Sequence, residues 1–520
     1  MRRRALLTSL ATGTATLSGC SVLGSPRDEQ STVTPAPVPD EAGDGSAGNG
    51  TETDGSSTDE SPTADGWPDD PASVIDLETG PRTYALGPTR FHTDDYADVR
   101  LAFDRTATAD HPARVRGVLE NANDFESTFR VEWLPAVGRV HGRQPDGYDH
   151  EARLHLVPTA NNDLAETVPE VTRDDGYWYV ADVGPWMTDT RRLDPGERVR
   201  VEYRLVGEQG TERPTGTYEF RGRDETVRIA VWDTTGPGPE AESRFAGRSV
   251  PVISRGDSEQ TVQWYHEADA STRAFVRPSV ERRALDGRIE FEMVNHSRET
   301  LRCGHWNLYK LADGQWYHVA PWGHTADCRG LAPGDRKTWP LRAFTGDPVP
   351  CDDHSGLTAG FLGGGIYAVV AGYGRNADAS GALVELVGDP VEVVPTGDAA
   401  AERDGGTVTV TTDSYGDGER PADAALAMAP ADDADEQSPS IPRSSPTREA
   451  ADRRLIAEVL MRDRNRALRN ALAHAADDVE RVVVRTDERA VDRTLGYDSD
   501  RRRFRFRGQT YEARRAGNGD

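Results

Sequence analysis

The sequence predicts a mainly β protein in which a disordered stalk precedes two tandem β-sandwiches and a small α+β domain of β-α-β-β type. Apolar and polar residues alternate with a period of two through much of residues 80–397, as in strands with one buried face. A Leu-x-Pro-Gly turn occurs twice in that range, and the one long helical pattern lies at 449–476.

The first 19 residues predict an export signal. Arg2, Arg3 and Arg4 precede an apolar run, 5–17, that is too short to span a bilayer. The arginines followed by Ala-Leu-Leu resemble a twin-arginine leader, and Leu-Ser-Gly-Cys, ending at Cys20, resembles a lipobox. The resemblance implies that Cys20 carries lipid and anchors the protein in the cell membrane, facing the extracellular side. An ordinary signal peptide with a chance cysteine is the alternative.

Residues 20–79 predict a disordered acidic stalk. They are rich in Ser, Thr, Asp, Glu, Gly and Pro, and contain too few large apolar side chains to offset the entropy of ordering. Asn49 begins an Asn-Gly-Thr glycosylation sequon in the stalk, and Asn295 begins an Asn-His-Ser sequon further on. Both are candidate glycosylation sites.

The charge of the chain is strongly acidic, with 88 Asp and Glu against 61 Lys and Arg, and a net charge of −27. Only Lys310 and Lys337 are lysines. An acidic, lysine-poor composition resembles proteins of haloarchaea, which implies that structure depends on salt to screen self-repulsion. The same charge argues against a nucleic-acid partner, because phosphate binding depends on clustered cations.

The two predicted sandwiches span 80–240 and 248–397. The turn 193–198, LDPGER, recurs as LAPGDR at 331–336; a strand ending near Asn123 or Asn295 precedes each turn, and a Gly-x-Tyr strand follows it. The segments FEMVN, WNLYKLADGQWYHVAPW, LAPGDRKTW and GGGIYAVVAGYG resemble a family of bacterial and archaeal immunoglobulin-like domains. That resemblance covers about 130 residues of the second sandwich, and the first matches only loosely.

Residues 400–520 predict the α+β domain. The segment TVTVTT predicts a strand, and a Pro- and Ser-containing acidic stretch at 428–447 predicts a disordered insert. Apolar residues at helical spacing predict a helix over 449–476. Strands are then expected at RVVVRTDE, RTLGYD and RFRFRGQTYEAR.

Cysteine and histidine residues concentrate in the second predicted sandwich. In an exported domain, two of the three cysteines Cys303, Cys328 and Cys351 are expected to form a disulfide, with three pairings open. The alternative is a zinc or copper site, because the spacing of thiols and imidazoles suits these metals. Its candidate ligands are Cys303, His305, His324, Cys328, Cys351 and His354.

The sequence contains no recognisable catalytic motif, neither a nucleophile elbow, a phosphate-binding loop, a zincin motif nor a dinucleotide fingerprint. We therefore predict a non-enzymatic cell-surface lipoprotein without a cofactor, with a binding or structural role. Its expected partners are the membrane, through the lipid, and an envelope protein or glycan. The alternatives are a copper- or zinc-binding protein or metal-dependent hydrolase centred on the Cys/His cluster, and an accessory subunit of a transporter or secretion complex.

Overall fold

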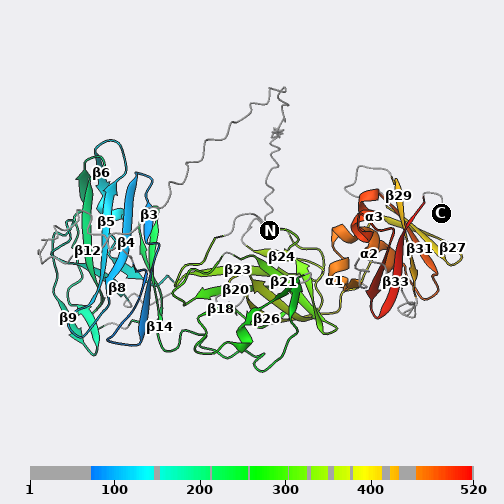
Figure 1. Cartoon of the computed structure of the whole chain (residues 1–520), viewed down its shortest axis with the longest axis horizontal. Coiled ribbons are helices and arrows are strands. Elements are labelled where there is room, and N and C mark those ends of the chain that lie inside the picture. The colour runs from blue at the N-terminus through cyan, green and yellow to red at the C-terminus, as the bar shows by residue number, and fades with distance from the viewer. Residues whose placement is uncertain are drawn as a thin grey trace, which may run out of the picture. The chain divides into compact units, whose positions relative to one another are not determined.

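The computed structural model describes residues 72–145, 153–210, 213–255, 258–302, 304–324, 329–349, 356–374, 379–412, 422–431 and 453–517 (Figure 1). Strands far outnumber helices in these residues, so the chain is mainly β as predicted. No helix within them has both the length and the apolar character needed to cross a membrane.

The first β region is a 12-stranded sheet with a separate two-stranded ribbon, β11–β6. The main order is β1-β2-β14-β13-β7-β8-β12-β5-β4-β3, with β10 beside β12 and β9 beside β10. Its elements are β1 (Val74–Asp76), β2 (Arg82–Gly87), β3 (Arg90–His92), β4 (Ala97–Arg105), β5 (Ala113–Asn121), β6 (Ser127–Arg130), η1 (Val131–Trp133), β7 (His141–Arg143), β8 (Arg153–Pro158), β9 (Val171–Asp174), β10 (Tyr177–Val180), β11 (Thr190–Leu193), β12 (Arg198–Glu208), β13 (Gly216–Arg221) and β14 (Thr226–Asp233).

The 12-stranded sheet curls around one core. Residues from strands far apart in the order, such as Leu86 of β2 and Leu119 of β5, belong to the same buried cluster. A bridge between Ala72 and Phe103 connects the chain just before β1 with β4 at the other end of the order. The alternation of side chains in β5 explains why the sheet has one core. Successive side chains of β5 are buried and half-buried in turn, so one face of the sheet supplies the core.

The second β region has two larger sheets that share a core. One is β17-β26-β25-β21-β22, with β19 also beside β26, and the other is β18-β20-β23-β24. Phe291 of the smaller sheet and Val369 of the larger one lie in the same buried cluster. The elements are β15 (Ile253–Arg255), β16 (Ser258–Gln260), β17 (Val262–Trp264), η2 (Tyr265–Glu267), β18 (Ala274–Pro278), β19 (Arg282–Ala284), β20 (Gly287–Asn295), β21 (Trp306–Ala312), β22 (Gln315–Ala320), β23 (Arg336–Ala343), β24 (Leu357–Ala359), β25 (Gly365–Ala371) and β26 (Ala379–Val387).

The two Pro-Gly turns have matching hydrogen bonds. Gly196 and Gly334 have φ of +70° and +76°, as a type II turn requires. The amide of Gly196 donates to the carbonyl of Asn121 at 2.9 Å, and that of Gly334 donates to the carbonyl of Asn295 at 2.7 Å. The repeat therefore extends from sequence to geometry, with Asn121 rather than Asn123 as the counterpart of Asn295.

The C-terminal region is a seven-stranded sheet in the order β27-β28-β31-β29-β33-β32-β30, with α2 against β31 and β29 and α3 against β29 and β33. The elements are β27 (Ala399–Asp404), β28 (Thr407–Thr412), β29 (Ala424–Pro430), β30 (Arg453–Leu455), α1 (Ala457–Leu460), η4 (Asp463–Asn465), α2 (Arg466–Ala473), β31 (Arg481–Thr486), α3 (Glu488–Leu495), β32 (Arg501–Phe506) and β33 (Gln509–Ala516).

This region contains more strands and helices than the predicted β-α-β-β unit. The expected helix over 449–476 is divided into β30, α1, η4 and α2, because a polar turn at 462–465 interrupts its apolar face. The expected strand RTLGYD is the end of α3, which Asp487 caps by accepting a hydrogen bond from the Ala490 amide at 2.7 Å. Residues 428–430 of the expected insert belong to β29, whereas 432–447 lie outside the described residues.

Candidate functional site

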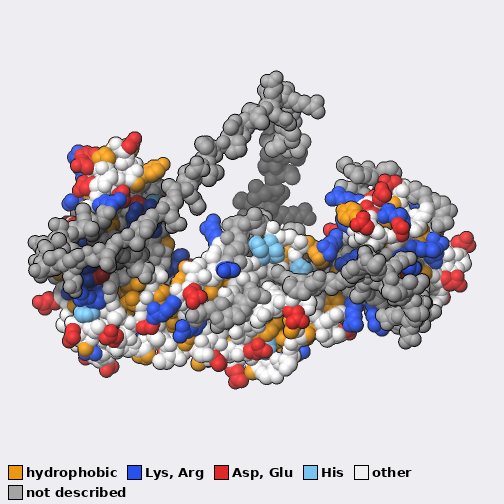
Figure 2. Space-filling model, in the orientation of Figure 1, with side chains coloured by type: hydrophobic (Ala, Val, Ile, Leu, Met, Phe, Trp, Pro, Cys, Tyr) orange, Lys and Arg blue, Asp and Glu red, His pale blue; other side chains and the backbone are white. Residues whose placement is uncertain are grey.

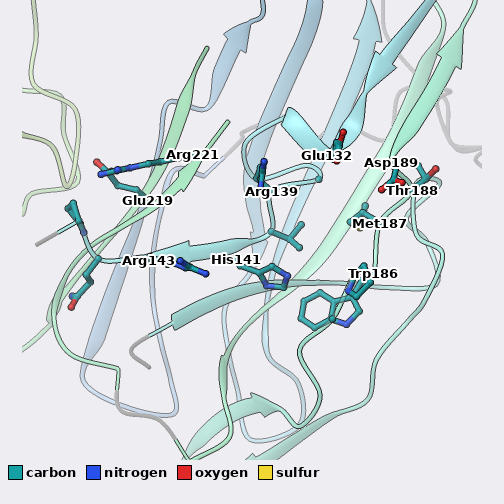
Figure 3. Close-up of a pocket in the computed structure, with 16 residues that line it drawn as sticks. Glu132, Arg139, His141, Arg143, Trp186, Met187, Thr188, Asp189, Glu219 and Arg221 are labelled. Carbon is teal, nitrogen blue, oxygen red and sulfur yellow. The ribbon is translucent and has the colours of Figure 1, made fainter. Parts of the chain in front are cut away.

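A pocket of about 700 Å³ opens in the first β region. Arg139, His141 and Arg143 come from β7 and the loop before it (Figure 3). Glu219 and Arg221 of β13 lie on one side, and the opposite side holds Glu132 of η1 with segment 184–189. The volume falls within the range of pockets for small molecules.

The loop before β7 holds its shape through buried contacts. The hydroxyl of Tyr203, a fully buried side chain of β12, donates to the carbonyl of Val137 at 2.7 Å. Gly138 passes so close to η1 that a Cβ atom there would lie 1.9 Å from the carbonyl oxygen of Val131. Only glycine permits this approach, so the wall of the pocket is fixed by the backbone.

Strand β7 presents two polar side chains to the pocket because alternate residues of a strand point to the same face. Gly142 is buried, and a Cβ atom there would lie 2.7 Å from the Phe220 ring. His141 and Arg143, the residues on either side of it, therefore share the opposite face. His141 is half-buried and Arg143 is exposed at the pocket.

Two histidines from neighbouring strands meet beside the pocket. His141 and His155 are register partners in β7 and β8, and their Nδ1 atoms are 2.8 Å apart. At that distance one Nδ1–H donates to the lone pair of the other. The edges of both rings approach Trp186, whose centroid lies 4.9 Å from that of His141 and 6.1 Å from that of His155.

Burial keeps both imidazoles neutral. It lowers the pKa of His155 to about 3, with smaller contributions from His141 and Arg153. Burial also lowers the pKa of His141, against the opposing effect of its hydrogen bond with the Gly184 backbone. The His155 side chain is fully buried, and its Nε2 has no hydrogen-bond partner in the described residues. The pair is therefore neutral, and His141 is the member of the pair that lines the pocket.

Within the described ranges of the chain, some charged groups of the pocket have a partner of opposite charge and others do not. Glu219 accepts hydrogen bonds from Arg221 at 2.7 Å and Arg228 at 3.1 Å. Burial alone would raise the pKa of Glu219, but these arginines outweigh it and lower the pKa. Arg139 and Arg143, in contrast, have no carboxylate within ion-pair distance in the part of the chain that the structure describes.

The predicted metal-site residues are only partly described. Cys303, Cys328, Cys351 and His354 lie outside the described residues, so the disulfide and metal predictions remain predictions. The His305 and His324 rings stack with their centroids 4.3 Å apart. The described residues contain no group of three or more His, Cys, Asp or Glu side chains arranged to hold a metal ion.

The side chain of Asn295 holds backbone segments together inside the second β region. Its side chain is fully buried, and its Nδ2 donates to the carbonyls of Glu299 and Leu331, both at 2.9 Å. A glycan would attach to that nitrogen and replace its hydrogen bonds, and glycosylation at Asn295 stays a prediction. Cys20 and Asn49 lie outside the described residues.

Sequence reasoning did not find the pocket in the first β region. Its residues come from segments between Glu132 and Arg221, and no motif joins them. The alternation of His141, Gly142 and Arg143 was a weak signal, because a glycine inside a strand often marks a close approach of another group.

Comparisons with known proteins give little further information. No protein-family model matches the chain, and no curated protein matches it. Among solved structures, one provisionally described as a membrane-anchored protein from Corynebacterium diphtheriae is 6% identical. The alignment covers 68% of this chain and 71% of that one, with a TM-score of 0.13. A likeness at that level carries no argument about fold or function.

Proposed function

We propose that the protein is a lipid-anchored binding protein of the extracellular face whose first β region captures a small anionic ligand. The anchor part of this proposal rests on the leader and Cys20. The binding part rests on the pocket in the first β region. The ligand class is a saccharide or similar polyol that carries a carboxylate.

One observation carries the binding proposal: two arginines without carboxylate partners line a formed pocket in a strongly acidic protein. The chain has 88 acidic residues against 61 basic ones, so most arginines have acids available nearby. Arg139 and Arg143 are exposed at the pocket with no such partner in the described residues. A guanidinium fork binds a carboxylate through two parallel hydrogen bonds, which makes these residues suited to an anionic ligand.

The other lining residues fit a polyol better than an apolar ligand. Glu132 and Asp189 present carboxylates that accept hydrogen bonds from hydroxyl groups. Met187 and Pro185 add apolar surface beside the buried Trp186. A pocket of about 700 Å³ has room for a ligand of one or two sugar rings.

We also propose that the first and second β regions are tandem immunoglobulin-like domains, as the turn repeat suggests. Tyr218 donates its hydroxyl hydrogen bond to the carbonyl of Pro214, and Tyr367 donates to that of Gly363, both at 2.8 Å. Each tyrosine bonds to the residue four positions before it, in the manner of the tyrosine corner of immunoglobulin-like sandwiches. Solving the structure of each region alone would test this assignment.

Titration calorimetry in molar KCl tests the binding proposal. The probes are glucuronate and galacturonate, with glucose as the uncharged comparison. We expect the uronates to bind and glucose to bind at least tenfold more weakly, because glucose leaves the arginines without an anion. R139Q and R143Q should each weaken uronate binding by about tenfold, the equivalent of roughly 1.4 kcal/mol.

The matched control is R173Q, because Arg173 is exposed on β9 of the same region and does not line the pocket. It should bind uronates like the wild type. Equal affinity for glucose and uronates, or equal losses in R139Q and R173Q, would overturn the assignment of the arginines. Absence of binding by both uronates at tens of millimolar would overturn this ligand class.

A further inference from the structure

A second cationic cleft lies in the C-terminal region, far along the chain from the pocket of the first β region. It is bounded by η4, α2, β31 and α3, with Thr412 at the end of β28. Four arginines line it: Arg464, Arg466, Arg485 and Arg493. Asp463 is the one acidic side chain among its lining residues.

Among the described residues, three of the four arginines of the cleft lack a carboxylate partner, whereas the fourth and other arginines of the same region have one. Arg466 is neutralised by two hydrogen bonds to Asp398, at 2.7 and 2.8 Å. Outside the cleft, Arg515 pairs with Asp492 at 2.6 Å and Arg501 with Glu512 at 3.9 Å. Arg464, Arg485 and Arg493 have no carboxylate within ion-pair distance in the described residues of the region.

The contacts that these three arginines do make leave their charge uncompensated. Arg464 lies over the Trp322 ring, 3.1 Å from its centroid, which holds the guanidinium without neutralising it. Arg493 donates from Nε to the carbonyl of Arg489 at 3.4 Å. Burial, and then the charges of Arg453 and Arg493, lower the pKa of Arg464 to about 10. Like charges held close together favour an anion between them.

The polar groups and the size of the cleft limit the class of ligand that it could bind. Thr486 is buried and lines the cleft together with Thr412, so hydroxyl groups lie beside the guanidinium groups. The cleft is small, with a volume of about 30 Å³, which suits one compact charged group. Arginine is well matched to phosphate, because its fork donates two hydrogen bonds to one group.

We propose that this cleft binds a phosphate group, either free inorganic phosphate or the phosphate of a lipid headgroup. Arg464, Arg485 and Arg493 supply the positive charge, and Arg466 stays committed to Asp398. Asp463 bounds the site on one side and disfavours a second anion. The inference is independent of the ligand proposed for the first β region, because no residue lines both cavities.

Thermal unfolding of the full chain in 2 M KCl at pH 7.5 tests the inference, with sodium phosphate added at constant ionic strength. A ligand that binds the folded state raises the melting temperature with concentration. We expect phosphate to do so, and R485Q and R493Q each to weaken the midpoint of the effect at least tenfold. The matched control R501Q removes an arginine whose side chain is 78% exposed on β32, and should respond like the wild type.

A second arm distinguishes the source of the phosphate. Variants lacking residues 1–20 are mixed with vesicles of phosphatidylglycerol or phosphatidylcholine and sedimented. Binding to phosphatidylglycerol that R485Q and R493Q lose, with no response to free phosphate, assigns a lipid headgroup; the reverse assigns the free ion. No response to either, or equal responses of R485Q, R493Q and R501Q, overturns the site.

Discussion

At the scale of single residues, the least expected feature is a fully buried imidazole with one unsatisfied nitrogen. His155 Nε2 lies 3.8 Å from a Glu208 carboxylate oxygen, beyond hydrogen-bond distance, while Nδ1 is bonded to His141. A buried polar atom without a partner costs stability. The His155–His141 bond and the Trp186 contact compensate for part of that cost and fix the wall of the pocket.

The depressed pKa of His155 predicts acid sensitivity. The ordinary pKa is 6.5 and the folded value is about 3, so below pH 6.5 the unfolded chain binds a proton that the folded chain does not. Stability from this group is complete above pH 6.5 and is lost as the pH falls toward 3. Between pH 6 and 4 the loss should approach about 1.4 kcal/mol per pH unit.

Urea unfolding in 2 M KCl at a series of pH values measures this loss. The H155Q variant should be less stable than the wild type at pH 7.5, and its unfolding free energy should fall less steeply with acid. His296, whose burial lowers its pKa to about 4, and His141, whose pKa burial also lowers, contribute to the slope that remains in the variant. Parallel pH profiles for wild type and H155Q would show that His155 does not titrate on unfolding.

At the scale of elements, each β region contains a buried asparagine whose side chain connects the end of a strand to a Pro-Gly turn. Asn121 Nδ2 donates to the carbonyls of Phe125, Leu193 and Asp194, at 2.9 to 3.1 Å. Asn295 makes two such bonds, to Glu299 and Leu331. The short side chain replaces a missing ladder bond where β5 and β20 leave their sheets.

Removing either amide should loosen its own region. N121A and N295A each remove the two or three hydrogen bonds that tie the strand end to the turn. At about 0.5–1.5 kcal/mol for each bond, the loss is about 1–3 kcal/mol. Hydrogen exchange is the most informative measurement, because each substitution should affect the exchange rates of its own β region only. N121A should accelerate exchange in β5 and β12 but not in β20 and β23, and N295A should do the opposite. Equal acceleration in both regions would mean that the two turns are not independent units.

At the scale of the whole molecule, charge is the dominant property. The net charge is −27, and basic side chains are almost all arginine. Figure 2 shows acidic and basic side chains interspersed on the face of the molecule that is in view. Many of the arginines are in ion pairs with Asp or Glu on neighbouring strands, such as Arg116 with Glu202 at 2.9 Å. Such pairs offset local repulsion but leave the overall acidic excess.

The acidic excess predicts that stability rises with salt. At about 1 M salt the Debye length is only about 3 Å, so the carboxylates no longer repel one another over distance. The melting temperature should fall on transfer from 2 M to 50 mM KCl. Glycine betaine at equal osmolality is the control: it is excluded from the protein surface but does not screen charge, so it should restore the melting temperature less than KCl does. Equal melting temperatures in both KCl concentrations would contradict the prediction.

The proposed anchor predicts the location of the whole molecule. C20S removes the thiol that accepts lipid, so the protein should move from the membrane pellet to the soluble fraction or the medium of the producing cell. S21A is the matched control, because it changes the neighbouring residue and keeps the thiol. Unchanged membrane association of C20S, measured by fractionation and immunoblot, would remove the lipid anchor from the proposal.

The sequence by itself determined the mainly β character, because apolar residues alternate with polar ones in β5 and in the first part of β12, as in strands with one buried face. It also determined the Pro-Gly turns, since Gly196 and Gly334 adopt the positive φ that the motif demands. It determined the acidic balance, which depends on composition alone. These are properties of one residue or of neighbours in the chain.

Only the tertiary structure decided which strands lie side by side, and therefore where function can reside. Alternation gives a residue's face but not its partner, so the meeting of His141 with His155 depended on the β7–β8 register. The same holds for charge: the sequence counts arginines, but whether Arg139 or Arg485 finds a carboxylate depends on distances across strands. Local pattern also failed at RTLGYD, where the Asp487 cap and burial of Leu495 favour a helix over a strand. Long-range contacts, which close only on folding, assemble both cavities.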